Sequence, residues 1–274
     1  EDVRSVVLTS SRARNDDSVD MLSDYDMEIF VRDLGPYLSI TESAVSAENQ
    51  DPADAWFEEK SALLVKWPLV PEAEDHWLTR LVQYRDGLRI DFQICDLPLH
   101  YHATFDAGYR VLIDKDDIAR TLPKANGAAL HIHRPTPERF ARRINAFLWD
   151  CLYVPKALRR GEEFFAFTML ADLHFRFLRE MLEWHIGAGH GWSVSSNKAG
   201  RWFRRFLEPE LYARVISLID GGAGTDHWDT WTKTRDIFQV LAEPLAQAVG
   251  AAFPAEQYRA VLEFGQSLQD APLE

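Results

Sequence analysis

Two aspartates separated by a single residue are the first feature of the chain with an evident chemistry. Asp24 and Asp26 lie in the run Ser23-Asp24-Tyr25-Asp26, at the start of a predicted strand. Because side chains alternate along a strand, both carboxylates point to the same face. Adjacent carboxylates repel each other unless they are solvated, share a proton or bind a cation. Their oxygens suit Mg²⁺, which proteins usually hold through one or two carboxylates plus substrate phosphates.

A third carboxylate, Asp91, is expected on a later strand, in the run Arg89-Ile90-Asp91-Phe92. Ile90 and Phe92 occupy the opposite face of that strand from Asp91. Two interpretations fit this pattern. Asp91 belongs either to the polar outer side of a surface strand or to the same metal site as the paired aspartates.

A turn of small residues precedes the paired aspartates. Ser10-Ser11-Arg12 follows directly after a predicted strand that ends at Thr9. A strand that runs through small residues into a helix presents backbone N–H groups and hydroxyls to a phosphate. Arg12 would add a charge-assisted hydrogen bond to the same phosphate.

Taken in this order, the turn, the paired aspartates and the third aspartate resemble the nucleotidyltransferase superfamily that includes DNA polymerase β. The resemblance implies that Asp24 and Asp26 bind two Mg²⁺ ions. It implies that Asp91 is a metal ligand, a general base, or both. It also implies that the Ser10–Arg12 turn binds the phosphates of a nucleoside triphosphate.

Longer runs resemble the aminoglycoside 6-adenylyltransferases, which modify streptomycin. In the first half, these runs extend from Ser10 to Val31 and from Asp86 to Ile94. The resemblance covers nearly the whole chain. The matching segments of the second half are Trp149, the run from Tyr153 to Leu158 with Arg160 and Glu162, and the run from Ser193 to Phe203.

Three positions depart from that family's pattern. Ser10 stands where the family usually has Gly, and Ala157 also replaces a Gly. Asp150 stands where a neutral polar residue is common. Gly allows the backbone to approach a triphosphate closely, so Ser10 is the departure that affects nucleotide affinity. Asp150 lies near the expected acceptor pocket, so it is the departure that affects acceptor choice.

The resemblance also assigns roles in the second half of the chain. AMP would pass from ATP to a hydroxyl of an aminoglycoside, the 6-position of streptomycin, with release of pyrophosphate. Lys156 and Arg160 would neutralise that pyrophosphate. Asp150 would pair with a guanidinium group of the acceptor. Trp149 would offer a cation–π face, unless it is a buried structural residue.

The elements that must position these residues differ between the two halves. The first half has short apolar runs, and Asp86-Gly87 between two alternating runs predicts a β-hairpin. We therefore expect an α/β (α+β) domain at 1–134, and the resemblance implies that its sheet is mixed, like that of DNA polymerase β. The predicted strands are 5–9, 26–34, 62–67, 78–84, 88–95 and 110–114.

The second half has helical periodicity from Pro137, which is preceded by Thr136 as a capping residue. A helical substrate-binding domain is expected at 135–274. Asp226 and Asp229 fit a helix start better than a binding site. The predicted helices are 137–150, 162–186, 198–207, 209–219, 226–248 and 255–268.

Charge and cysteine content narrow the classes of partner. The net charge of −13 disfavours nucleic acid and suits a small polycation. Apolar runs are too short to cross a membrane. Cys95 and Cys151 belong to no CxxC pair, which favours two buried, reduced thiols in a cytoplasmic protein.

Two alternatives to aminoglycoside adenylylation stay open. The same nucleotidyl transfer could act on another acceptor, either a small molecule or a protein. Alternatively, the chain could be a pseudoenzyme that binds a nucleotide without transferring it, for which Ser10 in place of Gly is the only support.

Overall fold

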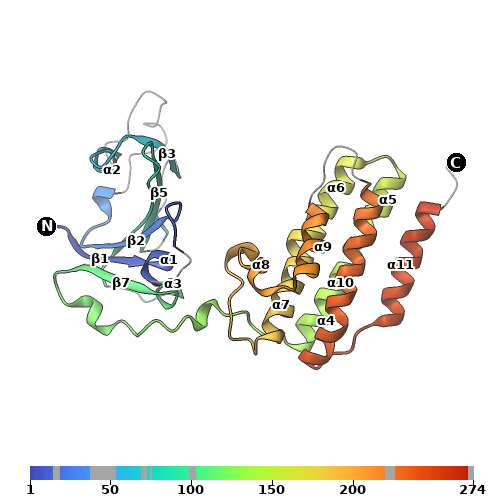
Figure 1. Cartoon of the computed structure of the whole chain (residues 1–274). Helices are drawn as coiled ribbons and strands as arrows, with labels where there is room; N and C mark the ends of the chain where they lie inside the picture. Colours follow the sequence, from blue (N-terminus) through green and yellow to red (C-terminus); the bar gives the residue numbers. More distant parts are fainter. Residues whose placement is uncertain are drawn as a thin grey trace. The chain divides into compact units, whose positions relative to one another are not determined.

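The computed structural model describes residues 1–14, 19–37, 54–68, 73–74, 76–98, 103–219 and 226–270. The chain forms two compact units, Glu1–Leu130 and His131–Glu274 (Figure 1). No described helix is both long enough and apolar enough to cross a membrane.

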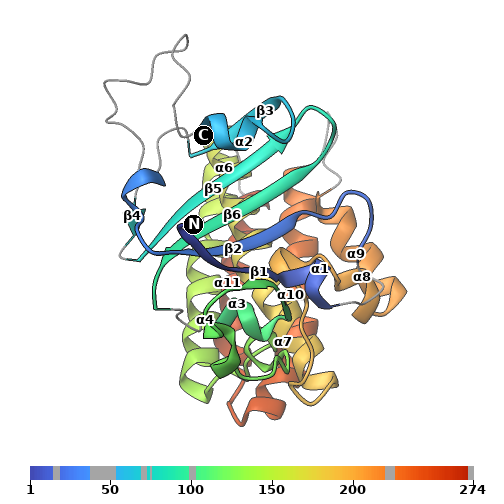
Figure 2. The ribbon, with the colours of Figure 1, turned by 90° about the vertical axis from the view of Figure 1, so that its left-hand side faces the viewer.

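The first unit is built on one mixed sheet with the strand order β3-β5-β6-β2-β1-β7, and β4 pairs with β5 (Figure 2). β2 and β6 are parallel, whereas β1 is antiparallel to both β2 and β7. This confirms the predicted mixed α/β architecture. The strands are β1 Val3–Thr9, β2 Tyr25–Val31, β3 Leu63–Trp67, β4 Ala73–Glu74, β5 Trp77–Tyr84, β6 Arg89–Asp96 and β7 Tyr109–Asp114.

The β5–β6 hairpin forms as its sequence predicts. Gly87 has a φ of 92°, which favours glycine, and Asp86 Oδ1 accepts a hydrogen bond of 3.0 Å from the Leu88 amide. Burial alternates along β5, where Leu78 and Val82 are each 1% exposed. The register follows from this alternation, because a slip of one residue would move the apolar side chains to the other face.

Each face of the sheet has its own apolar cluster. One includes Phe57 from α2 (Asp54–Glu58), packed with Ile29 and Phe92. The other includes Phe105 from α3 (Ala103–Asp106), packed with Phe30 and Cys95. The remaining short helices of this unit are α1 Ser10–Arg14, η1 Gly35–Tyr37, η3 Ile118–Thr121 and η4 Ala128–Leu130.

The second unit is helical and packs around one large apolar cluster that includes Phe147, Phe177, Trp231 and Phe238. Phe147 and Phe238 stack with ring centroids 3.6 Å apart. Thr136 caps the first helix, as predicted, by accepting a hydrogen bond from the Arg139 amide. The helices are α4 Pro137–Cys151, α5 Tyr153–Arg159, α6 Glu163–Asp172, η5 Leu173–Leu178, α7 Arg179–Gly189, η6 Lys198–Gly200, α8 Phe203–Phe206, α9 Pro209–Ile219, α10 His227–Val249 and α11 Ala255–Asp270.

The long helix predicted at 162–186 contains a π-helical segment, η5. There, His174 is 9% exposed and its Nε2 lies 2.7 Å from Thr234 Oγ1 on α10. Next to η5, Glu180 pairs with both Arg139 and Arg143 of α4, the Arg139 contact being 2.7 Å. These polar contacts fix α4 and α10 against the central helix.

One predicted helix is wrong. Residues 198–207 form only the short 3₁₀ turn η6 and the four-residue helix α8. Asn197, Ala199 and Gly200 all have positive φ angles, of 59°, 54° and 77°. A right-handed helix cannot run through residues in that conformation.

Candidate active site

Three carboxylates of the first unit, those of Asp24, Asp26 and Asp91, meet at the neighbouring strands β2 and β6. Asp26 of β2 is opposite Asp91 of β6 in the parallel register, and Thr9 of β1 is opposite Asp26 on its other side. Paired residues of neighbouring strands project to the same face. Asp24, just before β2, lies two residues from Asp26. Asp24 and Asp91 both contact the guanidinium group of one arginine.

That group is the guanidinium of Arg89, at the start of β6. Its Nε and Nη2 donate to the two Asp91 carboxylate oxygens at 2.9 and 3.0 Å. Arg89 Nε also lies 3.4 Å from Asp24 Oδ2. A single guanidinium thus neutralises part of the negative charge of the cluster through a bidentate contact.

Asp26 is the carboxylate whose charge is least compensated. Burial, together with the neighbouring charges of Asp91 and Asp24, raises the pKa of Asp26 to about 6. Arg89 and a hydrogen bond with Ser10 act in the opposite direction on this pKa. A cation at this position would relieve the repulsion between the carboxylates.

Ser10 links the turn at Ser10–Arg12 to this cluster. It follows Thr9 directly, has a φ of 60°, and hydrogen-bonds to Asp26. Its amide donates to the Gly108 carbonyl at 3.1 Å. Gly is favoured at positive φ, so the backbone explains why a glycine suits position 10.

Gly108 permits α1 to lie close to the start of β7. Its φ is 116°, and a Cβ atom there would lie 2.8 Å from Arg14 Cγ. A larger residue would displace α1, which begins with the Ser10–Arg12 turn. Neither Gly108 nor Arg89 was identified as a site residue from sequence. The position of Arg89, two residues before Asp91 on one strand, was the available signal.

Arg12 contacts the backbone before β2. Its Nη2 donates to the Ser23 carbonyl at 2.7 Å, and its Nε lies 3.2 Å from the Asp24 carbonyl. The guanidinium also stacks 4.0 Å from the centre of the Tyr25 ring. In this arrangement Arg12 fixes the segment that carries Asp24.

The donor set is of the type that a hard divalent cation prefers, because three carboxylates gather beside the Ser10–Arg12 turn. The side chains of Asp24 and Asp91 are 36% and 19% exposed, which leaves them accessible to an incoming ion. Among the described residues, however, no three such side chains stand in a ready metal-binding arrangement. The Arg89 guanidinium contacts carboxylate oxygens of Asp24 and Asp91 that would otherwise be available to a cation.

The predicted residues of the second unit lie on α4, α5 and the turn after α5. Trp149 is 66% exposed, so the alternative of a buried structural tryptophan is wrong. Partial burial and the nearby Asp172 raise the pKa of Asp150, which Arg176 opposes. Lys156 Nζ lies 5.9 Å from the centre of the Phe264 ring, and exposed Arg160 lies 4.0 Å from Glu162.

The acidic cluster near Trp228 is a helix start. Asp226 caps α10 by accepting a 2.9 Å hydrogen bond from the Trp228 amide. Asp229 pairs with Lys233 one turn later, at 2.6 Å. Both carboxylates therefore stabilise the start of α10.

Cys95 and Cys151 are free and buried, and burial raises the pKa of each thiol to about 12.

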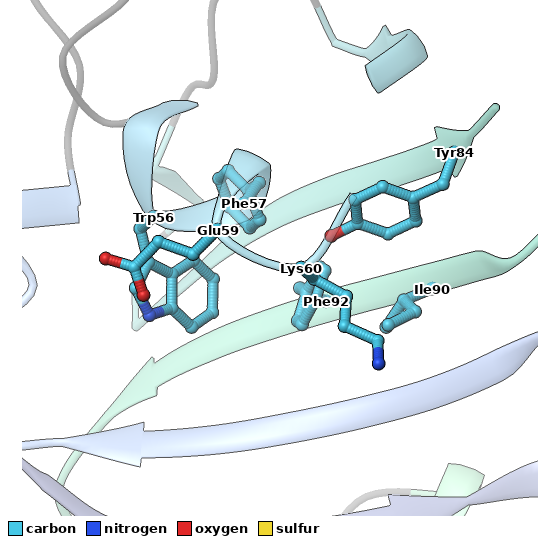
Figure 3. A pocket seen from close by; sticks show the side chains of 7 residues that line it. All are labelled: Trp56, Phe57, Glu59, Lys60, Tyr84, Ile90 and Phe92. Atoms are coloured by element: carbon cyan, nitrogen blue, oxygen red, sulfur yellow. The ribbon is translucent and has the colours of Figure 1, made fainter. Parts of the chain in front are cut away.

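A cavity of about 350 Å³ lies on the other side of the sheet from the carboxylates (Figure 3). Ile90 and Phe92 line it, and side-chain alternation places them opposite Asp91. Trp56 packs against Phe92 with ring centroids 5.2 Å apart, so the aromatic walls belong to the core below α2. This cavity is separate from the carboxylate site.

Sequence comparison finds similar proteins over most of the chain. Residues 1–268 match the family described as streptomycin adenylyltransferase. The aminoglycoside 6-adenylyltransferase of Bacillus subtilis is 26% identical over 93% of this chain and 87% of its own length. That of Campylobacter jejuni is 25% identical over 92% of this chain and 85% of its own length.

A crystal structure of an aminoglycoside 6-adenyltransferase from Bacillus subtilis aligns with 99% of this chain and 93% of its own, at 21% identity and a TM-score of 0.48. The family match alone spans almost the entire sequence. The predicted nucleotidyltransferase is thereby confirmed, and the chain belongs to the streptomycin adenylyltransferase family.

Proposed function

We propose that the protein transfers AMP from ATP to a hydroxyl of an aminoglycoside, the 6-hydroxyl of streptomycin, and releases pyrophosphate. The observation that carries this proposal is the register that sets Asp26 opposite Asp91, with Asp24 and the Ser10 turn beside them. Carboxylates and a phosphate-binding turn are the parts that nucleotidyl transfer requires.

Asp24, Asp26 and Asp91 would hold Mg²⁺, two ions in all. When bound, the metal supplies charge neutralisation on the phosphates and a lower pKa for the acceptor hydroxyl. Asp91 is also proposed to accept the proton from that hydroxyl, as a general base. The position of Asp91 is compatible with a metal ligand and with a general base, and the loss of either role would slow AMP transfer.

The residues of the turn have different proposed tasks. Ser11 offers its hydroxyl and amide to the triphosphate, and Ser10, whose amide donates to the Gly108 carbonyl, offers its hydroxyl. Arg12 is better assigned to positioning, because its guanidinium is already engaged by the Ser23 and Asp24 carbonyls. Lys156 and Arg160 remain the proposed pyrophosphate ligands of the second unit.

The helical unit is proposed to bind the acceptor. An aminoglycoside is a polycation, and the net charge of −13 favours its approach. Exposed Trp149 offers an aromatic face, and Asp150 next to it offers a carboxylate for a guanidinium group. The relatives named above are aminoglycoside 6-adenylyltransferases, which supports this acceptor class. A cytoplasmic location, where ATP is supplied, fits the two free thiols.

A panel assay tests the proposal. The protein is incubated with Mg²⁺, ATP labelled in the α-phosphate and single aminoglycosides, and pyrophosphate release and labelled product are measured. We expect both with streptomycin. Transfer only to another small molecule or to a protein would reject the acceptor, and nucleotide binding without transfer to any acceptor would identify a pseudoenzyme.

A further inference from the structure

A strained backbone segment follows α7 and leads into α8, in the helical unit (Figure 1). Asn197 has φ 59° and ψ 175°, a conformation that residues other than glycine rarely adopt. Ala199, two residues later, is left-handed with φ 54° and ψ 31°. Both cost free energy, and such strain concentrates at functional positions.

Local hydrogen bonds hold this strained segment in one shape. The Asn197 amide donates to Ser195 Oγ at 3.1 Å, and Asn197 Oδ1 accepts from the Lys198 amide at 2.6 Å. The Trp202 amide donates to the carbonyl of buried Ser196 at 3.0 Å. The side chains that project from the segment are therefore mounted on a fixed backbone.

Those side chains are cationic. Lys198, Arg201 and Arg204 are exposed, and within the described residues none of them forms an ion pair with a carboxylate. Arg205 also lies here, with its guanidinium 5.6 Å from the centre of the Phe206 ring. We call residues 197–205 the cationic loop.

The charge of the cationic loop contrasts with the rest of the chain. No Asp or Glu occurs from Trp184 to Leu207, although the chain has 43 acidic residues and a net charge of −13. Elsewhere in the helical unit, several arginines pair with acids, as Arg139 does with Glu180 and Arg179 with Glu183. Unpaired cations on a rigid backbone leave their hydrogen-bond donors available for an external anion.

We propose that the cationic loop binds a polyphosphate through Lys198, Arg201 and Arg204. This inference rests on the proposed function for the source of the ligand, since the triphosphate of ATP and the pyrophosphate product share this chemistry. The cationic acceptor is excluded as the ligand because like charges repel. A nucleic acid is disfavoured because the net charge of the molecule opposes a long polyanion.

The first experiment measures binding of inorganic tripolyphosphate to the full chain by calorimetry, with EDTA present. Removing divalent ions leaves the carboxylates of the first unit repulsive to phosphate, so binding reports on cations. The variant carries both Lys198→Ala and Arg201→Ala. We expect its dissociation constant to rise at least about tenfold, on the scale of one lost hydrogen bond to a charged group.

A matched control removes the same charge from the same unit. Arg214 and Arg259 are exposed on α9 and α11, and the double variant Arg214→Ala with Arg259→Ala should stay within about twofold of wild type. If both double variants bind tripolyphosphate equally weakly, the loss is explained by net charge alone and the proposal is overturned. Failure of the wild-type protein to bind tripolyphosphate would also overturn it.

Two further titrations, with Mg²⁺, identify the source of the polyphosphate. Weaker binding of a non-hydrolysable ATP analogue by the Lys198→Ala, Arg201→Ala variant assigns the loop to the substrate, and weaker binding of pyrophosphate alone assigns it to the product. If the wild-type protein transfers AMP to no acceptor, but the Lys198→Ala, Arg201→Ala variant alone loses tripolyphosphate binding, the proposed function is rejected and the binding role of the cationic loop is supported. If the wild-type protein transfers AMP, but this variant binds tripolyphosphate as tightly as wild type, only the role of the cationic loop is rejected.

Discussion

Ser10 shows how one backbone angle connects a sequence departure to the site. Its φ of 60° is unfavourable for a residue with a Cβ atom, yet its side chain hydrogen-bonds to Asp26. The aspartates and the turn were predictable because spacing of two and strand alternation place them without knowledge of the fold. The contacts of Arg12 were not predictable, because they depend on where the carbonyls of Ser23 and Asp24 point.

Substitutions at Ser10 separate the two effects. Ser10→Gly loses the hydroxyl but accepts the positive φ, whereas Ser10→Ala loses the hydroxyl and keeps the strain. We expect the Gly variant to be more stable than the Ala variant by about 1 kcal/mol, the reverse of their usual order. Urea unfolding measures this difference, and an Ala variant of equal or greater stability would contradict a left-handed Ser10.

Arg89 should compete with metal for the carboxylates. Without its guanidinium, Asp24 and Asp91 lose a counter-charge held at 3.4 and 2.9 Å. Arg89→Met is expected to lower the melting temperature in EDTA and to increase the rise that Mg²⁺ produces. Arg85→Met, an exposed change of equal charge on the same hairpin, is the control. An Mg²⁺-induced rise no larger in Arg89→Met than in wild type would refute this competition.

At the scale of elements, the strands and the long helices follow from periodicity, and two features of the helical unit do not. The π-helical segment η5 keeps the apolar face of the long helix continuous, so its sequence reads as ordinary helix. Phe203 in the cationic loop and Phe206 just after it have the three-residue spacing of a helix, but the backbone angles at Asn197 and Ala199 break the helix. Backbone strain of this kind cannot be predicted from the spacing of apolar residues.

His174 on η5 predicts how stability depends on pH. Burial lowers the pKa of His174 to about 4, whereas an unfolded histidine titrates near ~6.5. Between these values the unfolded chain binds a proton that the folded chain does not. Stability should therefore be fully present above pH ~6.5 and fall by roughly 2–3 kcal/mol as the pH drops towards the folded pKa.

Replacing His174 by Gln tests this assignment. Thr234 Oγ1 donates to the Thr230 carbonyl at 2.7 Å, so it accepts from His174 Nε2, and the Gln amide can also donate. Unfolding free energies of His174→Gln should vary less between pH 7 and pH 4 than those of wild type. Exposed His133→Gln is the control. An unchanged pH slope in His174→Gln would mean that other groups cause the dependence.

At the scale of the whole molecule, the family match from residue 1 to 268 covers both the sheet unit and the helical unit. The sheet unit carries the carboxylates, and the helical unit carries the exposed Trp149 and the cationic loop. The proposed reaction uses both, because it joins a polyanionic nucleotide to a polycationic acceptor. In the proposed reaction the negative net charge would attract the acceptor, and the local cations would bind the phosphates.

The central claim is that the carboxylate cluster on β2 and β6 performs AMP transfer, and Asp24→Asn tests it most directly. The measurement is the rate at which α-labelled AMP passes from ATP to streptomycin with saturating Mg²⁺. The control is Asp117→Asn, a change of equal charge at an exposed residue whose left-handed backbone suits Asn. We predict a loss of at least about 100-fold in Asp24→Asn, with an unchanged fold by circular dichroism and no loss in the control. Turnover like that of wild type in Asp24→Asn would contradict the account.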